Sequence, residues 1–434
     1  MTSSSRSEVV LPKRQNAISS LRTNFKWTLA GNVIYSLCQW GMLSVLAKAG
    51  NAGIVGRFAL GLAVSAPIFM FANLQLRSVQ ATDARREYCF ADYFTLRMLT
   101  TSMGLLAVVA IVFAMPYGRP TRTVILLVAL TKSIECISDV IGGLLQLHER
   151  LDQVAISLMC RGIVSIFAFS SAFLFTHSLI ASIGAMVLAW LAVLLGYDIR
   201  RAGEALLPDE AWFRLEWRLA RKLFLLSLPL GVVMTLISLN TNIPRYVLER
   251  YGGTTEVGIF AALAYSIVAL NLVVQALSQS AITRLAYMFS RRMFKDFSNL
   301  LLKLSTFGIM VVSAGVPLSL IFGGRLLNIL YNAQYAEHVF TLAILVGASG
   351  IGSIAFFITS GLNSARRFRE QVPIFLLCTL TVTLGCLILV PRYRLNGAAI
   401  ALLLSSVVGL IGNIVVMRST LRSARDISLI SEVT

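Results

Sequence analysis

Long apolar runs follow one another along almost the whole chain, and they restrict it to one class of fold. A helix that crosses the hydrocarbon core of a bilayer needs about 20 apolar residues, and roughly twelve such runs fit in this sequence. The runs lack the alternation of barrel strands, and lipid cannot satisfy open backbone groups, so each run should be helical. We therefore predict an all-α polytopic membrane protein of about 12 transmembrane helices, with spans at residues 23–48, 53–76, 93–115, 121–147, 154–175, 178–198, 223–248, 257–283, 299–322, 337–363, 371–391 and 395–418.

Charge and composition agree with this prediction and narrow the possible partners. Charged residues make up 13% of the chain, against roughly 25% in soluble domains. The net charge of +18 indicates basic cytoplasmic loops and an anionic ligand, and no nucleic acid partner is expected for a chain of this class. The six cysteines form no CxxC pair and the three histidines form no cluster, so neither a disulfide framework nor a metal site is expected.

The positions of lysine and arginine predict the orientation of the spans. If the N-terminus is cytoplasmic, most of the 38 Lys and Arg residues fall in inner loops or at inner helix ends, as the positive-inside bias requires. Both termini are therefore expected in the cytoplasm. Charged and apolar residues alternate over 200–222, which predicts an amphipathic linker on the membrane surface. The predicted organisation is a cytoplasmic tail 1–22, a first lobe 23–199 of six helices, the linker 200–222, a second lobe 223–420 of six helices, and a cytoplasmic tail 421–434.

The two predicted lobes share short motifs in the same order. Residues 46–50 correspond to 248–252, and Gly56 near the start of the second span corresponds to Gly258 near the start of the eighth. Because six is an even number, both lobes enter the membrane in the same sense, which makes a parallel repeat about an axis along the membrane normal. Two parallel six-helix lobes around a central cavity are the arrangement expected of an alternating-access transporter.

Several motifs in the first half support a more specific comparison. They are Gly31-Asn32 with Tyr35 and Gln39, then Val55-Gly56-x-Phe58, then the run from Leu74 to Asp83, and then Tyr88-x-Phe90-x-x-Tyr93-x-x-x-Arg97. With these motifs in this order, the chain resembles Wzx-type polysaccharide flippases over about residues 20–420. These flippases form the polysaccharide export branch of the multidrug/oligosaccharidyl-lipid/polysaccharide exporter superfamily.

The resemblance implies an activity, a location and a set of partners. The activity is the transport of an undecaprenyl-diphosphate-linked oligosaccharide, the repeat unit of an exopolysaccharide, capsule or O-antigen, from the inner to the outer leaflet. The location is the bacterial cytoplasmic (inner) membrane, and the substrate enters a V-shaped cavity between the lobes. The implied partners are this anionic polyprenyl-diphosphate-linked oligosaccharide, membrane lipid and other polysaccharide assembly proteins, and no cofactor is implied.

Two other functions stay open. An ion-coupled multidrug exporter of the same superfamily should favour an acidic cavity, whereas basic residues predominate around these spans. A membrane enzyme of polysaccharide assembly, such as a polymerase, ligase or acyltransferase, should bring catalytic residues together. The chain has no GxSxG, Walker A or dinucleotide motif, so it is not expected to be an enzyme or to hydrolyse ATP.

The fourth span carries the densest group of intramembrane charges. Lys132, Glu135 and Asp139 are three, four and seven residues apart, so they share one helical face. Each charge costs about 2.5–3.5 kcal/mol at the bilayer centre, so this face should point into the bundle or the cavity. In one interpretation all three residues serve ion coupling, with Glu135 and Asp139 as a coupled pair. In the other, Lys132 pairs with Glu135, and Asp139 pairs with Arg161 of the next span.

Other polar residues inside or beside the spans are candidate substrate contacts. Arg161 could meet a diphosphate or a sugar acid, since guanidinium matches phosphate. Arg57 and Arg245 lie near predicted outer helix ends, where snorkelling is the alternative. Arg77 and Arg97 flank the first inner loop, where the positive-inside bias is the alternative. The amides that could bind sugar hydroxyls, or bond neighbouring helices instead, are Asn32, Gln39, Asn271 and Gln275.

Overall fold

The computed structural model describes residues 21–83, 87–206, 211–214, 216–365, 367 and 369–433. In that part of the chain every regular element is a helix, which confirms the predicted all-α class. In chain order the elements are α1 (Leu21–Ala49), α2 (Ala52–Asn73), α3 (Leu76–Thr82), α4 (Phe90–Ala114), α5 (Arg119–Leu147), α6 (Leu151–Thr176), α7 (Leu179–Val193), η1 (Leu194–Asp198), α8 (Ile199–Ala205), α9 (Trp217–Tyr265), α10 (Val268–Ser290), α11 (Phe294–Met310), η2 (Val311–Gly315), α12 (Val316–Leu330), α13 (Ala333–Ala336), α14 (Val339–Ser364), η3 (Arg369–Gln371) and α15 (Val372–Val433).

The helices have the length and surface of membrane spans. Among the described residues, nine helices are long and apolar enough to cross a bilayer. Large apolar side chains cover the outer surface: Phe175 is 87% exposed and Phe167 is 70% exposed. A water-soluble protein rarely exposes large contiguous apolar patches, whereas lipid accepts them. The prediction of a multi-pass membrane protein is thus confirmed.

Two of these helices are too long for a single crossing. α9 has 49 residues and α15 has 62, while one crossing needs about 20. Each contains one residue with positive φ, Gly253 at 70° and Arg394 at 50°, where the helix direction can change. These residues fall between predicted spans seven and eight and between eleven and twelve. The breaks agree with the predicted boundaries, while the total of twelve spans and their orientation stay predictions.

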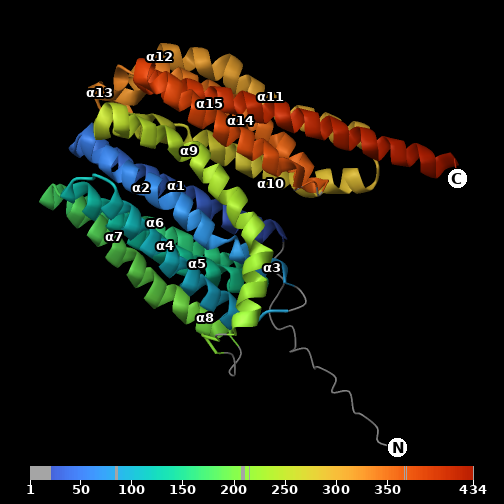
Figure 1. Cartoon of the computed structure of the whole chain (residues 1–434), viewed down its shortest axis with the longest axis horizontal. Coiled ribbons are helices and arrows are strands. Elements are labelled where there is room, and N and C mark those ends of the chain that lie inside the picture. Colours follow the sequence, from blue (N-terminus) through green and yellow to red (C-terminus); the bar gives the residue numbers. More distant parts are fainter. Residues whose placement is uncertain are drawn as a thin grey trace, which may run out of the picture.

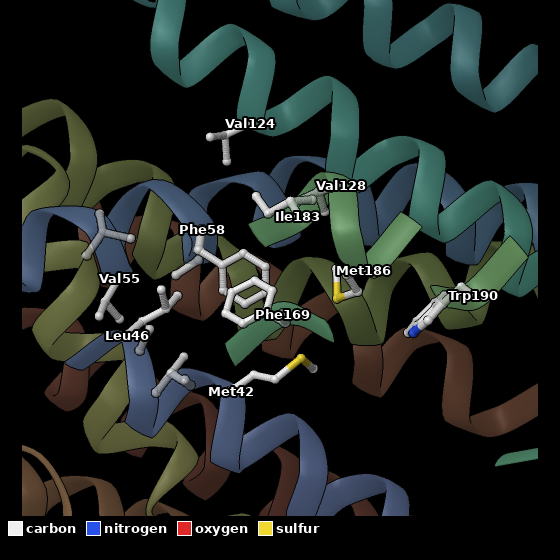
Figure 2. Close-up of a cluster of buried hydrophobic side chains, with 14 of the residues drawn as sticks. Met42, Leu46, Val55, Phe58, Val124, Val128, Phe169, Ile183, Met186 and Trp190 are labelled. Carbon is white, nitrogen blue, oxygen red and sulfur yellow. The ribbon is translucent and has the colours of Figure 1, made fainter. Parts of the chain in front are cut away.

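The two halves of the chain form two groups of helices (Figure 1). In the figure α1 to α8 lie together, α10 to α15 lie together, and α9 runs between the groups along α2. Part of the core of the first group is shown in Figure 2, where the rings of Phe58 and Phe169 lie close together, with centroids 5.7 Å apart. The second group has a core of its own, in which Leu285, Phe297 and Leu362 are buried together. This arrangement supports the predicted two-lobe organisation.

The groups meet at residues that the repeat relates to one another. Gly56 of α2 and Gly258 of α9 lie so close that a Cβ atom on either would collide with the backbone of the other helix. In the predicted repeat these two glycines are equivalent residues, which should then lie beside the axis that relates the two halves. Near this contact, Asn332 Nδ2 donates to the Ala47 carbonyl over 3.0 Å, and Trp40 Nε1 donates to the Tyr331 hydroxyl over 3.2 Å. The two halves are therefore closed against each other at this end of the bundle.

The predicted linker is divided between neighbouring elements. Residues 200–205 belong to α8, which continues α7 through the π-helical turn η1, and α9 already begins at Trp217. Trp212 packs edge-on against Phe90 and Phe94, each at a ring distance of 5.7 Å, which attaches this segment to α4. Residues 207–210 and 215 of the predicted linker lie outside the described residues, as do 1–20 of the predicted N-terminal tail.

Candidate functional site

A cavity of about 650 Å³ lies between α9 and the helices α10, α14 and α15 of the second group. Three of the predicted site residues line it together: Arg245 from α9, and Asn271 and Gln275 from α10. Sequence reasoning did not select Asn240 or Ser349, which also line it. The volume falls in the range of about 300–1,000 Å³ typical of small-molecule sites. The structure thus joins candidates that are up to 30 residues apart in the sequence.

Arg245 is a cation without a counter-charge in this cavity. Its Nη1 atom donates to Asn242 Oδ1 over 3.1 Å, and its buried Nε atom has no hydrogen-bond partner among the described residues. No carboxylate lies within ion-pair distance of it in the described part of the chain. A charged side chain at membrane depth normally has a partner or a wet cavity. This arrangement therefore suits an anionic ligand.

The amide groups of the cavity are oriented by hydrogen bonds from other helices. Asn271 Oδ1 accepts from Ser349 Oγ over 3.2 Å, and Asn240 Oδ1 accepts from Ser405 Oγ over 2.9 Å. Within the described residues, neither amide nitrogen donates to a protein group. Both amides thus present N–H donors, which phosphate and hydroxyl oxygens can accept.

A second polar cluster lies in the first group, where α3, α4 and α5 meet. Asp139 Oδ2 lies 3.1 Å from Arg97 Nη2, and its Oδ1 lies 3.6 Å from Arg77 Nη1. Arg97 is fully buried, whereas the Arg77 side chain is 30% exposed. The predicted alternative in which Asp139 pairs with Arg161 is therefore wrong. One carboxylate between two guanidinium groups leaves this cluster with one surplus positive charge.

A break between α2 and α3 positions the two arginines. Leu74 and Gln75 both have positive φ, 49° and 52°, which is rare for residues with side chains. The break interrupts the helical hydrogen-bond ladder, and Arg97 Nη1 donates to the Asn73 carbonyl there over 2.8 Å. Irregular backbone at membrane depth persists only where protein or a cavity satisfies it. On the other side, a Cβ atom on Gly143 would lie 3.2 Å from the Arg77 Cα atom, so a glycine lets α3 approach α5.

The predicted Lys132–Glu135 pair is confirmed. Lys132 Nζ lies 2.7 Å from Glu135 Oε2, and Tyr35 and Arg161 lie close enough to interact with the same carboxylate. The Arg161 side chain is buried, with its Cζ atom 6.0 Å from the centre of the Trp190 ring. Lys132, Glu135 and Arg161 again leave one surplus positive charge.

The remaining predicted residues lie apart from these clusters. Arg57 lines a separate cavity of about 250 Å³ beside His177 and Ile180. Asn32 is exposed on α1 and donates to the Thr28 carbonyl of its own helix, and Gln39 is half-buried on the same helix. The structure therefore gathers Arg245, Asn271 and Gln275 in one place and Arg77, Arg97 and Asp139 in another, and it leaves Arg57, Asn32 and Gln39 outside both.

Comparison with known proteins places the chain in a family. Residues 21–289, more than half of the chain, match the family model described as polysaccharide biosynthesis protein. The chain belongs to this family. It is also similar to the capsular polysaccharide biosynthesis protein CapF of Staphylococcus aureus, with 29% identity over 392 residues that cover 89% of this chain and 97% of the relative.

Solved structures show that this polysaccharide biosynthesis family member has a transporter fold. It is similar to the lipid II flippase MurJ in an inward closed conformation, with a TM-score of 0.68 and 11% identity over 92% of this chain and 90% of the other. It is also similar to a multidrug resistance MATE transporter of the MOP superfamily in an inward-facing conformation, with a TM-score of 0.62 and 12% identity over 94% and 96%. These likenesses show that the chain shares the overall fold of MurJ and of MATE transporters.

Proposed function

We propose that this protein is a secondary flippase that moves an undecaprenyl-diphosphate-linked oligosaccharide from the inner to the outer leaflet by alternating access. The observation that carries the proposal is the cavity around Arg245. It combines a cation without a counter-charge and amide donors inside a membrane-embedded bundle. A diphosphate carries the negative charge that Arg245 lacks as a partner, and guanidinium binds phosphate oxygens in a bidentate manner.

The cavity also provides for the sugar part of such a substrate. Asn240, Asn271, Gln275 and Ser349 offer the amide and hydroxyl groups that match sugar hydroxyls. The head of the lipid would therefore lie between the helices while its chain stays in the apolar phase. Family membership and the similarity to CapF support a role in polysaccharide assembly, and the MurJ-like fold supports movement of a lipid-linked substrate.

The contact between Gly56 and Gly258 would serve as the closing surface of the alternating cycle. Two glycines let the backbones of α2 and α9 meet without interlocked side chains. The two groups of helices can then separate here without side chains having to unlock, while they close at the opposite end. The ion-coupling role of Lys132, Glu135 and Asp139 stays a prediction. Both carboxylates are paired with cations, so proton coupling would require an ion pair to open first.

A deletion strain complemented with variants tests the proposal. The deletion should abolish surface polysaccharide and build up lipid-linked intermediate at the inner leaflet. Arg245→Ala should fail to complement, with at least a tenfold loss of surface polysaccharide at equal protein level. The matched control is Arg250→Ala, because Arg250 is exposed on the same helix. A deletion strain with normal polysaccharide and no intermediate would contradict the proposed function.

A multidrug exporter is the second candidate, because the fold is about equally close to that of a MATE transporter. The positive charge of Arg245, the charged side chain that lines the cavity, argues against cationic drugs as substrates. Dye efflux from cells that overproduce the protein distinguishes the two. Efflux that depends on Arg245, with unchanged surface polysaccharide in the deletion strain, would favour the exporter.

A further inference from the structure

An apolar groove of about 410 Å³ runs along the seam between the two groups of helices, separate from the Arg245 cavity. Pro67 and Phe71 of α2, Met103 and Ala107 of α4, and Phe224 of α9 are among the residues that line it. The groove opens toward the lipid-facing surface, because Met103 on its wall is 69% exposed. It is therefore accessible from the membrane.

The wall of the groove contains two hydroxyl groups, and neither is available to a ligand. Thr100 Oγ1 donates to the Arg97 carbonyl over 3.3 Å, and Thr235 Oγ1 donates to the Gly231 carbonyl over 2.8 Å. Each hydroxyl is thus bonded within its own helix, which leaves methyl groups for contact. The small residues Gly104 and Ala72 let α4 pack closely against α2 beside the groove, since a Cβ atom on Gly104 would lie only 3.3 Å from the Ala72 Cβ atom. The groove therefore suits a thin hydrocarbon chain.

One end of the groove adjoins the cluster that carries a surplus positive charge. Leu74 lines the groove at the break between α2 and α3, and Arg97 binds the carbonyl of the preceding residue, Asn73. Thr100 in the groove wall lies one helical turn from Arg97. Arg77, on the far side of the break, is 30% exposed and holds Asp139 only at 3.6 Å. An apolar channel that ends beside an accessible guanidinium matches a molecule with an alkyl chain attached to a phosphate.

We propose that this groove seats the first isoprene units of the polyprenyl chain at the entry stage of transport, when the adjoining phosphate lies near Arg77 and has not yet moved to Arg245. The inference rests on the proposed function and adds the place where the chain leaves the protein. Transfer of a chain from lipid into an apolar groove gains little hydrophobic free energy, because lipid tails are as apolar as the groove. The groove therefore guides the chain, while the charged head supplies the affinity.

Site-specific photo-cross-linking tests the position of the chain. Met103→p-benzoylphenylalanine places the photoreactive group in the groove. Leu106→p-benzoylphenylalanine is the matched control, since Leu106 is 67% exposed on the same helix and is absent from the groove lining. The full-length protein in phosphatidylcholine nanodiscs is irradiated with radiolabelled undecaprenyl diphosphate. We expect at least fivefold more adduct at 103 than at 106, and Arg77→Ala should reduce the adduct at 103 to the level at 106.

The possible outcomes separate this inference from the function on which it rests. Equal labelling at positions 103 and 106 would mean that both contact bulk lipid, and it would overturn the proposal that the groove seats the chain. Labelling at 103 that excess phosphatidylglycerol removes would assign the groove to a phospholipid and also overturn the inference. Binding of undecaprenyl diphosphate to the unmodified protein without labelling at 103 would place the chain elsewhere and leave the flippase intact. Failure of the unmodified protein to bind undecaprenyl diphosphate would count against both.

Discussion

The ion pair between Arg97 and Asp139 offers a quantitative test of how the first group of helices is held together. Arg97→Ala leaves a membrane-embedded carboxylate with one weaker partner and also removes the donor that satisfies the Asn73 carbonyl. Loss of one partner of a buried pair costs about 3–5 kcal/mol. The Asp139 side chain keeps 21% exposure and has Arg77 at 3.6 Å, so we expect the lower end, about 3 kcal/mol.

Two further variants make the expectation specific. Arg77→Ala removes the longer, 30% exposed contact and should cost about 1 kcal/mol or less. The double variant Arg97→Ala with Asp139→Asn removes the uncompensated charge, so it should be more stable than Arg97→Ala alone. The measurement is equilibrium unfolding of the purified protein in mixed micelles with increasing SDS, followed by circular dichroism. A loss of about 3 kcal/mol corresponds to about two powers of ten in the folding equilibrium.

If Arg97→Ala destabilised the protein no more than Arg77→Ala, the fully buried guanidinium would not be the main partner of Asp139. If the double variant were as unstable as the single variant, the cost would come from lost packing around Arg97 and not from the unpaired carboxylate.

Two other predictions concern the closing surface and the loop before α14. Gly56→Leu places a side chain where the Thr254 carbonyl lies, so the closed end cannot form. Disulfide cross-linking between Ala47→Cys and Asn332→Cys, which lie in contact at this end, should then fall at least fivefold. An unchanged cross-linking yield would contradict the tight contact between α2 and α9. Burial lowers the pKa of His338 below its usual range. The unfolded chain therefore binds more protons near pH 6, and stability should fall as the pH drops below about 6.5. The melting temperature should decrease by a few degrees at most between pH 7.5 and pH 5.5, and His338→Gln should remove that His-dependent part; an identical decrease in the variant would assign it to other groups.

The class of fold could be predicted from the sequence because the hydropathy of a run depends only on the residues in that run. A run such as residues 93–115 must be a helix in lipid whatever its neighbours are, and α4 covers Phe90–Ala114. The Lys132–Glu135 pair could be predicted for a similar reason, since residues three apart on a helix are neighbours. The repeat could also be read from short motifs, and its equivalent glycines, Gly56 and Gly258, meet in the structure.

The break between α2 and α3 could not be predicted. Positions 74 and 75 are leucine and glutamine, not glycine or proline, so no local sequence signal predicts a left-handed backbone there. The break persists because Arg97, which comes from another helix, satisfies the freed Asn73 carbonyl. A local feature thus depends on a partner that lies 24 residues away in the chain.

By itself the sequence determined that this chain crosses a membrane many times and which polar residues stand out within apolar helices, and it predicts that the two halves repeat. Only the tertiary structure decided which of them act together. It paired Asp139 with Arg97 over a separation of 42 residues, and it gathered Arg245, Asn271 and Gln275 around one cavity while Arg57 stayed apart. The physical reason is that the free energy of placing an apolar run in lipid is a sum over its own residues, so the sequence alone gives it. The partner of a charge inside the membrane is instead set by which helices pack beside it.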